Sequence, residues 1–165
     1  MNNDKVAEIY AFVAKVEALL KDLEKWASES YLQTVRGEVD VSEETLGTYS
    51  VPSLTISDQY GNFLAEIVPI GTRILGANGR IDLRGRYDKA IVVDLNEGGP
   101  TLTTTMIDGS TDKKRTTKFY RGIDQDGWYW IDRTAQPKGH VLTKELFLGL
   151  LTQVSDYDRT YTTLI

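Results

Sequence analysis

YGNFLAEIVPIGTRILGANGRIDLRGRYDKAIVVDL, residues 60–95, is the stretch that decides the fold. Runs of β-branched and aromatic residues alternate in it with short clusters of glycine, asparagine and aspartate, a pattern typical of antiparallel strands joined by tight turns. The strongest turn signal is Asn78-Gly79, because both central residues of a type I′ turn need positive φ. We therefore predict a hairpin whose paired strands are residues 73–77 and 80–86.

The same strand-like pattern extends on both sides of this stretch. Runs of strand-forming residues between turns predict about eight strands over residues 48–133, joined by short links and therefore arranged as an antiparallel meander. The run AIVVDL, residues 90–95, is the most apolar and is predicted to be central. The pattern is compatible with either a curved open sheet or a barrel-like one.

A helix is predicted at each end of the sheet, over residues 1–36 and 143–155. In both segments apolar residues recur at spacings of three and four, which places them on one stripe. The first stripe is expected to pack on the sheet rather than to form a dimer seam, since a seam needs sustained heptads. Thr143 is placed to cap the second helix. The fold class is α+β, with one domain over residues 1–165.

The segment between the first helix and the sheet is EVDVSEETLG, residues 38–47. It is short, acidic and rich in turn-forming residues. Two interpretations remain, a solvated connection and a site for a cation or a basic partner. The solvated connection is favoured, because acidic residues in connections commonly face water.

Composition excludes several functional classes. The 165 residues are 41% hydrophobic and 26% charged, which is ordinary for a globular protein. The formal charge of −5 makes nucleic acid an unfavourable partner. The chain has no cysteine, so thiolate metal sites and thiol nucleophiles are excluded. It shows no signal-peptide pattern and no apolar run of membrane-spanning length, so we expect a soluble cytoplasmic protein.

One predicted strand has a strongly charged face. Strict alternation places four charged side chains of residues 80–86 together, and a fifth lies across the predicted turn. These residues are Arg73, Arg80, Asp82, Arg84 and Arg86. Arginine forks suit carboxylate and phosphate groups, so this face is the candidate site for a small anionic ligand. The alternative is a solvated sheet face whose ion pairs contribute little.

Aromatic residues gather near the end of the predicted sheet. Trp128, Trp130 and Tyr120 are the candidate interface residues, because exposed aromatics often carry binding energy. Alternation puts both tryptophans on one face with Tyr129 opposite, which also predicts that at least some of these rings are core. If the tryptophans are core, truncating them should destabilise the fold.

A basic cluster precedes these aromatics and is centred on a predicted turn at residues 108–114. Its members are Lys113, Lys114, Arg115, Lys118 and Arg121. Basic residues beside aromatics suit single-stranded nucleic acid. An ordinary basic surface is the favoured interpretation, because the cluster is centred on a turn in an acidic chain.

No catalytic, metal or cofactor motif is found. The single histidine, His140, lies in a loop with proline and glycine, and the chain has neither a nucleophile elbow nor a phosphate-binding loop. We therefore expect a non-enzymatic binding protein that acts through a protein–protein interface, such as an inhibitor, an immunity-type protein or an adaptor. The alternative is a small anionic-ligand-binding protein or an enzyme that uses the arginine and carboxylate face in a curved sheet.

Overall fold

The computed structural model describes residues 3–74, 76–109 and 111–158. Its elements, in chain order, are α1 (Asn3–Glu29), β1 (Gln33–Glu43), β2 (Gly47–Ser57), β3 (Phe63–Gly71), β4 (Gly79–Gly85), β5 (Lys89–Leu95), β6 (Thr101–Asp108), β7 (Thr111–Lys118), β8 (Gly127–Ile131), β9 (Gly139–Val141) and α2 (Lys144–Val154). The predicted α+β class, with a helix at each end of an antiparallel meander, is confirmed.

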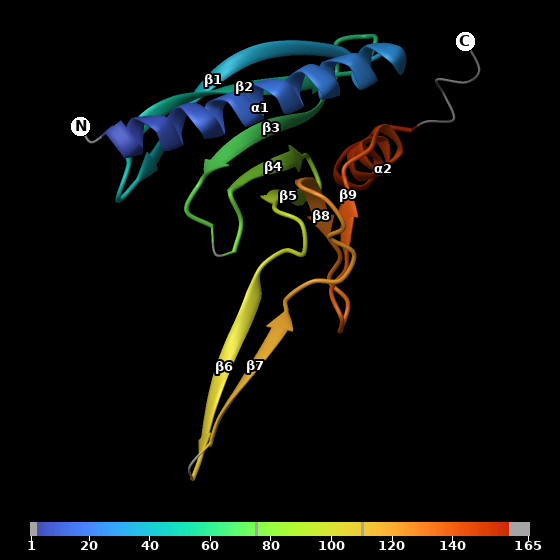
Figure 1. Ribbon diagram of the computed structural model, residues 1–165. Coiled ribbons are helices and arrows are strands. Elements are labelled where there is room, and N and C mark those ends of the chain that lie inside the picture. The colour runs from blue at the N-terminus through green and yellow to red at the C-terminus, as the bar shows by residue number, and fades with distance from the viewer. Residues whose placement is uncertain (1–2, 75, 110, 159–165) are drawn as a thin grey trace.

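Seven of the strands form one curved sheet in the order β1-β2-β3-β4-β5-β8-β9. Neighbouring strands are antiparallel, and β1 and β9 are the two edges, so the described sheet is open. In Figure 1, α1 lies along β1, β2 and β3, while α2 lies at the other end of the sheet beside β9. The strands β6 and β7 form a separate two-stranded ribbon that extends away from the sheet and from both helices.

Helix α1 ends at Glu29, seven residues before the predicted limit of 36, and residues 1 and 2 lie outside the described part of the chain. Its buried stripe confirms the predicted packing on the sheet and consists of Phe12, Val16, Leu19, Leu20, Leu23 and Ala27. The helix ends because Tyr31 has a φ of 61°, in the left-handed region, and the Leu32 N–H donates to the Ala27 carbonyl.

The segment predicted to be a solvated connection, residues 38–47, instead supplies half of a regular strand. Strand β1 pairs with β2 along its whole length, from Gln33–Ser57 to Glu43–Gly47. Val41 is buried in the main core and Val39 packs against it. The alternation of these two valines is a strand signal that the acidic residues around them, Glu38, Asp40, Glu43 and Glu44, obscured.

The hairpin predicted at Asn78-Gly79 is wrong. The chain reverses over residues 72–78, and Gly79 is the first residue of β4. Positive φ occurs at Gly71 and Gly76 instead. Gly79 has a packing role, because a Cβ there would lie 2.5 Å from a ring carbon of Phe12. The glycine lets α1 approach the strand directly.

The described residues form nine strands where about eight were predicted. The additional strands are β1 and β9, whereas the predicted strand at 73–77 is reduced to one isolated bridge between Ile74 and Ala77. Residues 101–123 were expected to continue the sheet but do not. Strand β8 lies beside β5 instead and pairs with it from Leu95–Gly127 to Val92–Trp130. Within the described residues, β6 and β7 therefore pair only with each other.

Helix α2 begins at the predicted cap, where the Thr143 hydroxyl accepts the Leu146 N–H. Its apolar stripe packs into the main core, and its last turn lies on β4. At the contact, a Cβ on Gly85 would lie 2.0 Å from the carbonyl oxygen of Val154. The Tyr87 N–H donates to the same oxygen at 3.0 Å, which fixes the end of the helix against the turn after β4.

Replacing Gly85 with alanine should therefore displace the end of α2 and lower the free energy of unfolding by about 2 kcal/mol. Gly149→Ala is the matched control, because that glycine lies within α2 with open space around its Cβ position and should gain about 0.5 to 1 kcal/mol. Urea denaturation of both variants checks the prediction. Equal stability of the two would contradict the close packing of α2 on β4.

No helix within the described residues is long and apolar enough to cross a membrane.

Candidate functional site

Asp82, in the middle of β4, is fully buried and lies among three cations. Arg80 binds it with two hydrogen bonds, from Nε to Oδ1 at 2.7 Å and from Nη2 to Oδ2 at 3.0 Å. Arg84 Nη2 lies 3.6 Å from Oδ2, and Lys89 Nζ lies 3.9 Å from the same oxygen. One carboxylate therefore balances one arginine, and two further cations remain beside it.

The structure brings together three of the five predicted ligand residues, Arg80, Asp82 and Arg84. Arg73 instead pairs with Glu8 of α1 at 3.0 Å. Arg86 lies beyond the end of β4, 3.8 Å from Asp156. The predicted set is therefore spread over three places.

Lys89 was missing from the prediction. It is the direct partner of Arg84 across the β4–β5 pair. The short reversal over residues 85–88 could have identified it, since residues at equal distances from a tight turn face each other. The side chains of Arg84 and Lys89 are 46% and 49% exposed, so this charged face is open to solvent.

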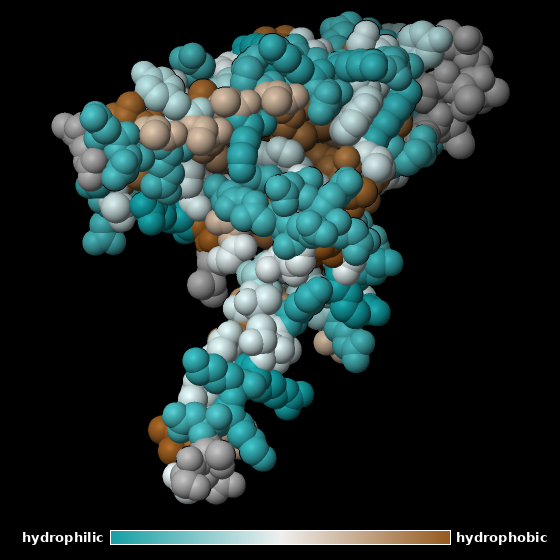
Figure 2. All heavy atoms as spheres, in the orientation of Figure 1, coloured by the Kyte–Doolittle hydropathy of each residue, from teal (hydrophilic) through white to brown (hydrophobic). Residues whose placement is uncertain are grey.

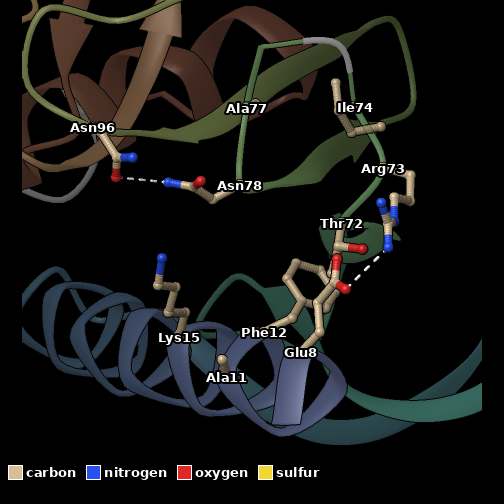
Figure 3. Close-up of a pocket in the computed structure, with 10 residues that line it drawn as sticks. All are labelled: Glu8, Ala11, Phe12, Lys15, Thr72, Arg73, Ile74, Ala77, Asn78 and Asn96. Carbon is tan, nitrogen blue, oxygen red and sulfur yellow. Dashed lines mark hydrogen bonds and ion pairs between the residues drawn. The ribbon is translucent and has the colours of Figure 1, made fainter. Parts of the chain in front are cut away.

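A pocket of about 470 Å³ lies between α1 and the chain reversal at 72–78 (Figure 3). Its lining comprises Glu8, Ala11, Phe12, Lys15, Thr72, Arg73, Ile74, Ala77, Asn78 and Asn96. Three polar contacts surround it. These are the Glu8–Arg73 ion pair, a hydrogen bond from Asn78 Nδ2 to Asn96 Oδ1 at 2.9 Å, and the 2.6 Å ion pair of Lys15 with buried Asp94. Each cation already has an anionic partner, so the pocket attracts neither sign of charge strongly.

Glu43, at the end of β1, holds the same reversal from the other side. Its Oε1 accepts the N–H groups of Thr72 at 2.9 Å and Arg73 at 2.8 Å, and its Oε2 accepts the Tyr49 hydroxyl. Burial opposes ionisation of Glu43, but these hydrogen bonds outweigh it and hold its pKa below the usual range. Burial and the bond to Glu43 raise the pKa of Tyr49.

We expect this contact to make stability depend on pH. Because the pKa of Glu43 is lower in the folded state, its contribution is present above the unfolded value of about 4.3 and is lost as the pH falls further. Glu43→Gln should lower stability at neutral pH and flatten the loss of stability below about pH 5. Urea denaturation across a pH series measures both effects. Exposed Glu44→Gln is the control, and identical pH profiles for the two variants would contradict the assignment.

The predicted interface aromatics are largely covered. Trp128 and Trp130 are partly buried against the main core, and Tyr120 is partly buried against a second, smaller core. Tyr129 is 1% exposed and belongs to that second core with Val93, Leu95 and Ile123. Both faces of β8 therefore serve packing, and the tryptophans offer only part of their surface to a partner.

His140 lies on β9 and contacts Asp132. Its Nε2 is 2.9 Å from Asp132 Oδ2, and its ring centre is 5.5 Å from that of Trp130. The hydrogen bond from His140, with the N–H of Lys138 and the hydroxyl of Thr134, holds the pKa of Asp132 well below its usual range. This contact joins the ends of the β8–β9 hairpin. No group of three histidine or acidic side chains within the described residues could hold a metal ion.

The β6–β7 ribbon is the most exposed part of the structure, and we refer to residues 101–118 as the arm. Every side chain described over residues 101–107 and 112–118 is exposed. Near the tip, Met106 is 61% and Ile107 is 80% exposed. Figure 2 shows the arm as a narrow projection of hydrophilic residues and residues of intermediate hydropathy, with hydrophobic atoms near its end.

Both faces of the arm combine threonine with cations. The cross-strand register places Leu102, Thr104 and Met106 on one face, opposite Thr117, Arg115 and Lys113. The other face includes Lys114 and Lys118 opposite Thr105 and Thr101. The sequence also indicates this exposure, because β6 (TLTTTMID) and β7 (TDKKRTTK) have no apolar face in common that could pack on a core. Four of the five residues of the predicted basic cluster thus lie on strand β7 rather than in a turn, and Arg121 lies beyond the end of β7.

A hollow of about 530 Å³ lies at the root of the arm. Its lining comprises Gly98, the run from Lys118 to Asp124, and residues 135–137. The rings of Phe119 and Tyr120 are 6.3 Å apart and nearly perpendicular, and Arg121 Nη2 donates to the Gln136 carbonyl at 3.1 Å. Tyr120, predicted as an interface residue, therefore lies next to the basic flank of the arm.

Comparison of the chain with protein-family models, with curated proteins and with solved structures yields no match.

Proposed function

We propose that this protein is a non-enzymatic binding protein, acting through a protein–protein interface, and that the arm is its principal contact. The observation that carries the proposal is the exposure of the arm on both faces. A two-stranded ribbon without a packed face is marginal by itself, because three or more strands or a covering helix are needed for independent stability. A partner that covers the arm would supply the missing contacts.

The tip and shaft of the arm differ in what they offer a partner. Met106 and Ile107 at the tip are large, exposed apolar side chains of the kind that fill pockets in interface centres. The shaft carries Lys113, Lys114 and Arg115, which favour an acidic partner surface. The arm is thus suited to an acidic protein surface with an apolar depression.

Site-specific crosslinking tests this proposal. A photo-reactive amino acid at position 106 should give an adduct of defined mass in cells that produce the protein. The same substitution at Tyr60, which is 78% exposed on the turn between β2 and β3, is the matched control and should give none. The adduct should disappear when Lys114 and Arg115 are both changed to glutamate. Equal adducts from both positions would contradict an interface on the arm.

A second candidate function is the binding of a small oxyanion by Arg84 and Lys89. The observation in its favour is that Asp82 engages Arg80 fully, while the other two cations lie farther away and half exposed. Inorganic phosphate should then raise the melting temperature of the wild-type protein and not that of Arg84→Ala/Lys89→Ala. An equal shift in both proteins would exclude binding at this face.

A further inference from the structure

The arm has two strand edges with no neighbour in the described sheets. Strands β6 and β7 pair with each other from Thr101–Lys118 to Asp108–Thr111. The outer backbone N–H and carbonyl groups of each strand are therefore available to another chain. Proteins usually protect such edges, because an extended segment can add to them as a new strand.

The two edges differ in charge. Strand β6 contains threonine and apolar residues along most of its length, whereas β7 carries Lys113, Lys114, Arg115 and Lys118 with a single described carboxylate, Asp112. Alternation places Lys113 and Arg115 on one face of β7 and Lys114 and Lys118 on the other. A strand beside β7 would thus have cations along both of its faces.

The hollow at the arm root lies where β7 ends. Lys118, the last residue of β7, lines it together with Phe119, Tyr120 and Arg121. Phe119 is 36% exposed, so part of its ring is available to a ligand. A segment that follows the edge of β7 toward its end would reach a depression lined by two aromatic rings and two cations, with one carboxylate, Asp124.

We infer that β7 accepts an extended acidic segment of the partner protein as a third strand of the arm. Main-chain hydrogen bonds to the outer edge of β7 would supply affinity, and carboxylates at adjacent positions of the segment would point to opposite faces and meet the cations on both. An apolar or aromatic side chain at one end of the segment would fit the hollow. The inference rests on the proposed function and specifies how the arm binds.

The addition of a third strand explains two features of the arm that a contact at the tip alone would not explain, its two-stranded form and the charge difference between its strands. It removes the marginal two-stranded state, because a three-stranded ribbon is the smallest sheet with independent stability. It also uses the charge asymmetry between β6 and β7. Nucleic acid is the less suitable anion, because it has no peptide backbone that could pair with β7 and its higher charge density meets a chain that carries −5 as a whole.

A defined peptide tests the inference on the full-length protein. The probe is a fluorescent peptide, about as long as the eight-residue β7, in which pairs of adjacent glutamates alternate with threonine–valine pairs. We expect weak, salt-sensitive binding by fluorescence anisotropy, and slower hydrogen exchange of the β7 amides when the peptide is bound. Lys114→Glu/Arg115→Glu should weaken the binding about tenfold. The control, Lys21→Glu/Lys25→Glu on the exposed face of α1, makes the same charge change and should have no effect.

Two altered peptides separate strand addition from charge attraction alone. A peptide with proline in place of each threonine and valine keeps its glutamates but loses backbone donors on both edges, and it should not bind. A peptide with lysine in place of glutamate should not bind either. Equal binding of the proline peptide would overturn the strand mechanism, as would no binding of the glutamate peptide at about 1 mM.

Other outcomes would assign the arm to a different ligand. Tighter arm-dependent binding of random-sequence duplex DNA than of the peptide would overturn the inference in favour of nucleic acid. Self-association that the β7 charge reversal abolishes would overturn it in favour of a second copy of this chain. If crosslinking from position 106 succeeds while the peptide fails, the proposed function stands and strand addition alone is wrong.

Discussion

Replacing Asp82 with asparagine is expected to lower the free energy of unfolding by about 3 kcal/mol. The carboxylate is completely buried and accepts two hydrogen bonds from Arg80, and two more cations lie within 4 Å of it. Asparagine retains the shape but leaves these cations without a counter-charge. The loss should lie at the lower end of the range for buried ion pairs, because the Arg80 side chain is 24% exposed and can turn toward water.

Glu66→Gln is the matched control for this experiment. Glu66 is exposed on β3 and is the direct cross-strand partner of Arg84. Its change removes the same charge from the same neighbourhood and should cost less than about 0.5 kcal/mol. Urea denaturation of both variants measures the difference. Similar losses would show that net charge, and not the Asp82–Arg80 contact, determines stability at this face.

Replacing Tyr129 with alanine is expected to cost about 3 to 5 kcal/mol, the range for large buried aromatics. The ring is 1% exposed and packs with Val93, Leu95 and Ile123 in the second core. Tyr129→Phe should cost only about 1 kcal/mol, because it removes only the contacts of the hydroxyl, which donates to the Gln125 carbonyl at 2.7 Å and accepts the Gln125 N–H at 3.3 Å. Thermal and urea unfolding of both variants check the two values.

Exposed Tyr60→Ala is the control, with an expected change within about 0.5 kcal/mol. Trp128→Ala and Trp130→Ala should each cost less than Tyr129→Ala, since both tryptophans are only partly buried. A larger loss at either tryptophan would show that the main core, and not the second one, depends on β8.

The second core connects stability to the proposed binding surface. Ile123 belongs to it, and the Ile123 carbonyl accepts the Gly98 N–H at 2.7 Å. The Phe119 N–H donates to the Pro100 carbonyl at 3.0 Å, which brings the two ends of the arm together. The root of the arm is thus attached to the core around Tyr129. Loss of that ring should weaken crosslinking from position 106 even at temperatures where the main sheet stays folded.

Local sequence patterns predicted those elements whose residues carry the signal themselves. The stripe of α1, the Thr143 cap and the antiparallel order of the central strands all depend on neighbours a few residues apart. The prediction of a turn at Asn78-Gly79 failed because Gly79 is required for close packing against Phe12, which is distant in the chain. Strand β1 was missed because its acidic residues resemble a connection, although its full pairing with β2 fixes it as a strand.

The candidate site residues show the same difference between what local patterns predict and what contacts between distant segments decide. Alternation along β4 correctly grouped Arg80, Asp82 and Arg84 on one face. It could not show that Asp82 is buried or that Lys89 joins it, because both depend on which strand lies beside β4. Nor could alternation show that Arg73 lies apart from this group, because the chain reversal at 72–78 places Arg73 beside Glu8 of α1.

By itself the sequence determined the α+β class, the helices at each end and the alternating charge of β4, because periodicity and capping are local properties of the chain. Only the tertiary structure decided the role of residues 60–95, which the sequence presented as a hairpin scaffold. In the folded protein β5 pairs with β8, and residues 101–118 are therefore excluded from the sheet. The exposed arm, its basic edge and the hollow at its root follow from that pairing, because strand neighbours far apart in sequence are chosen by packing.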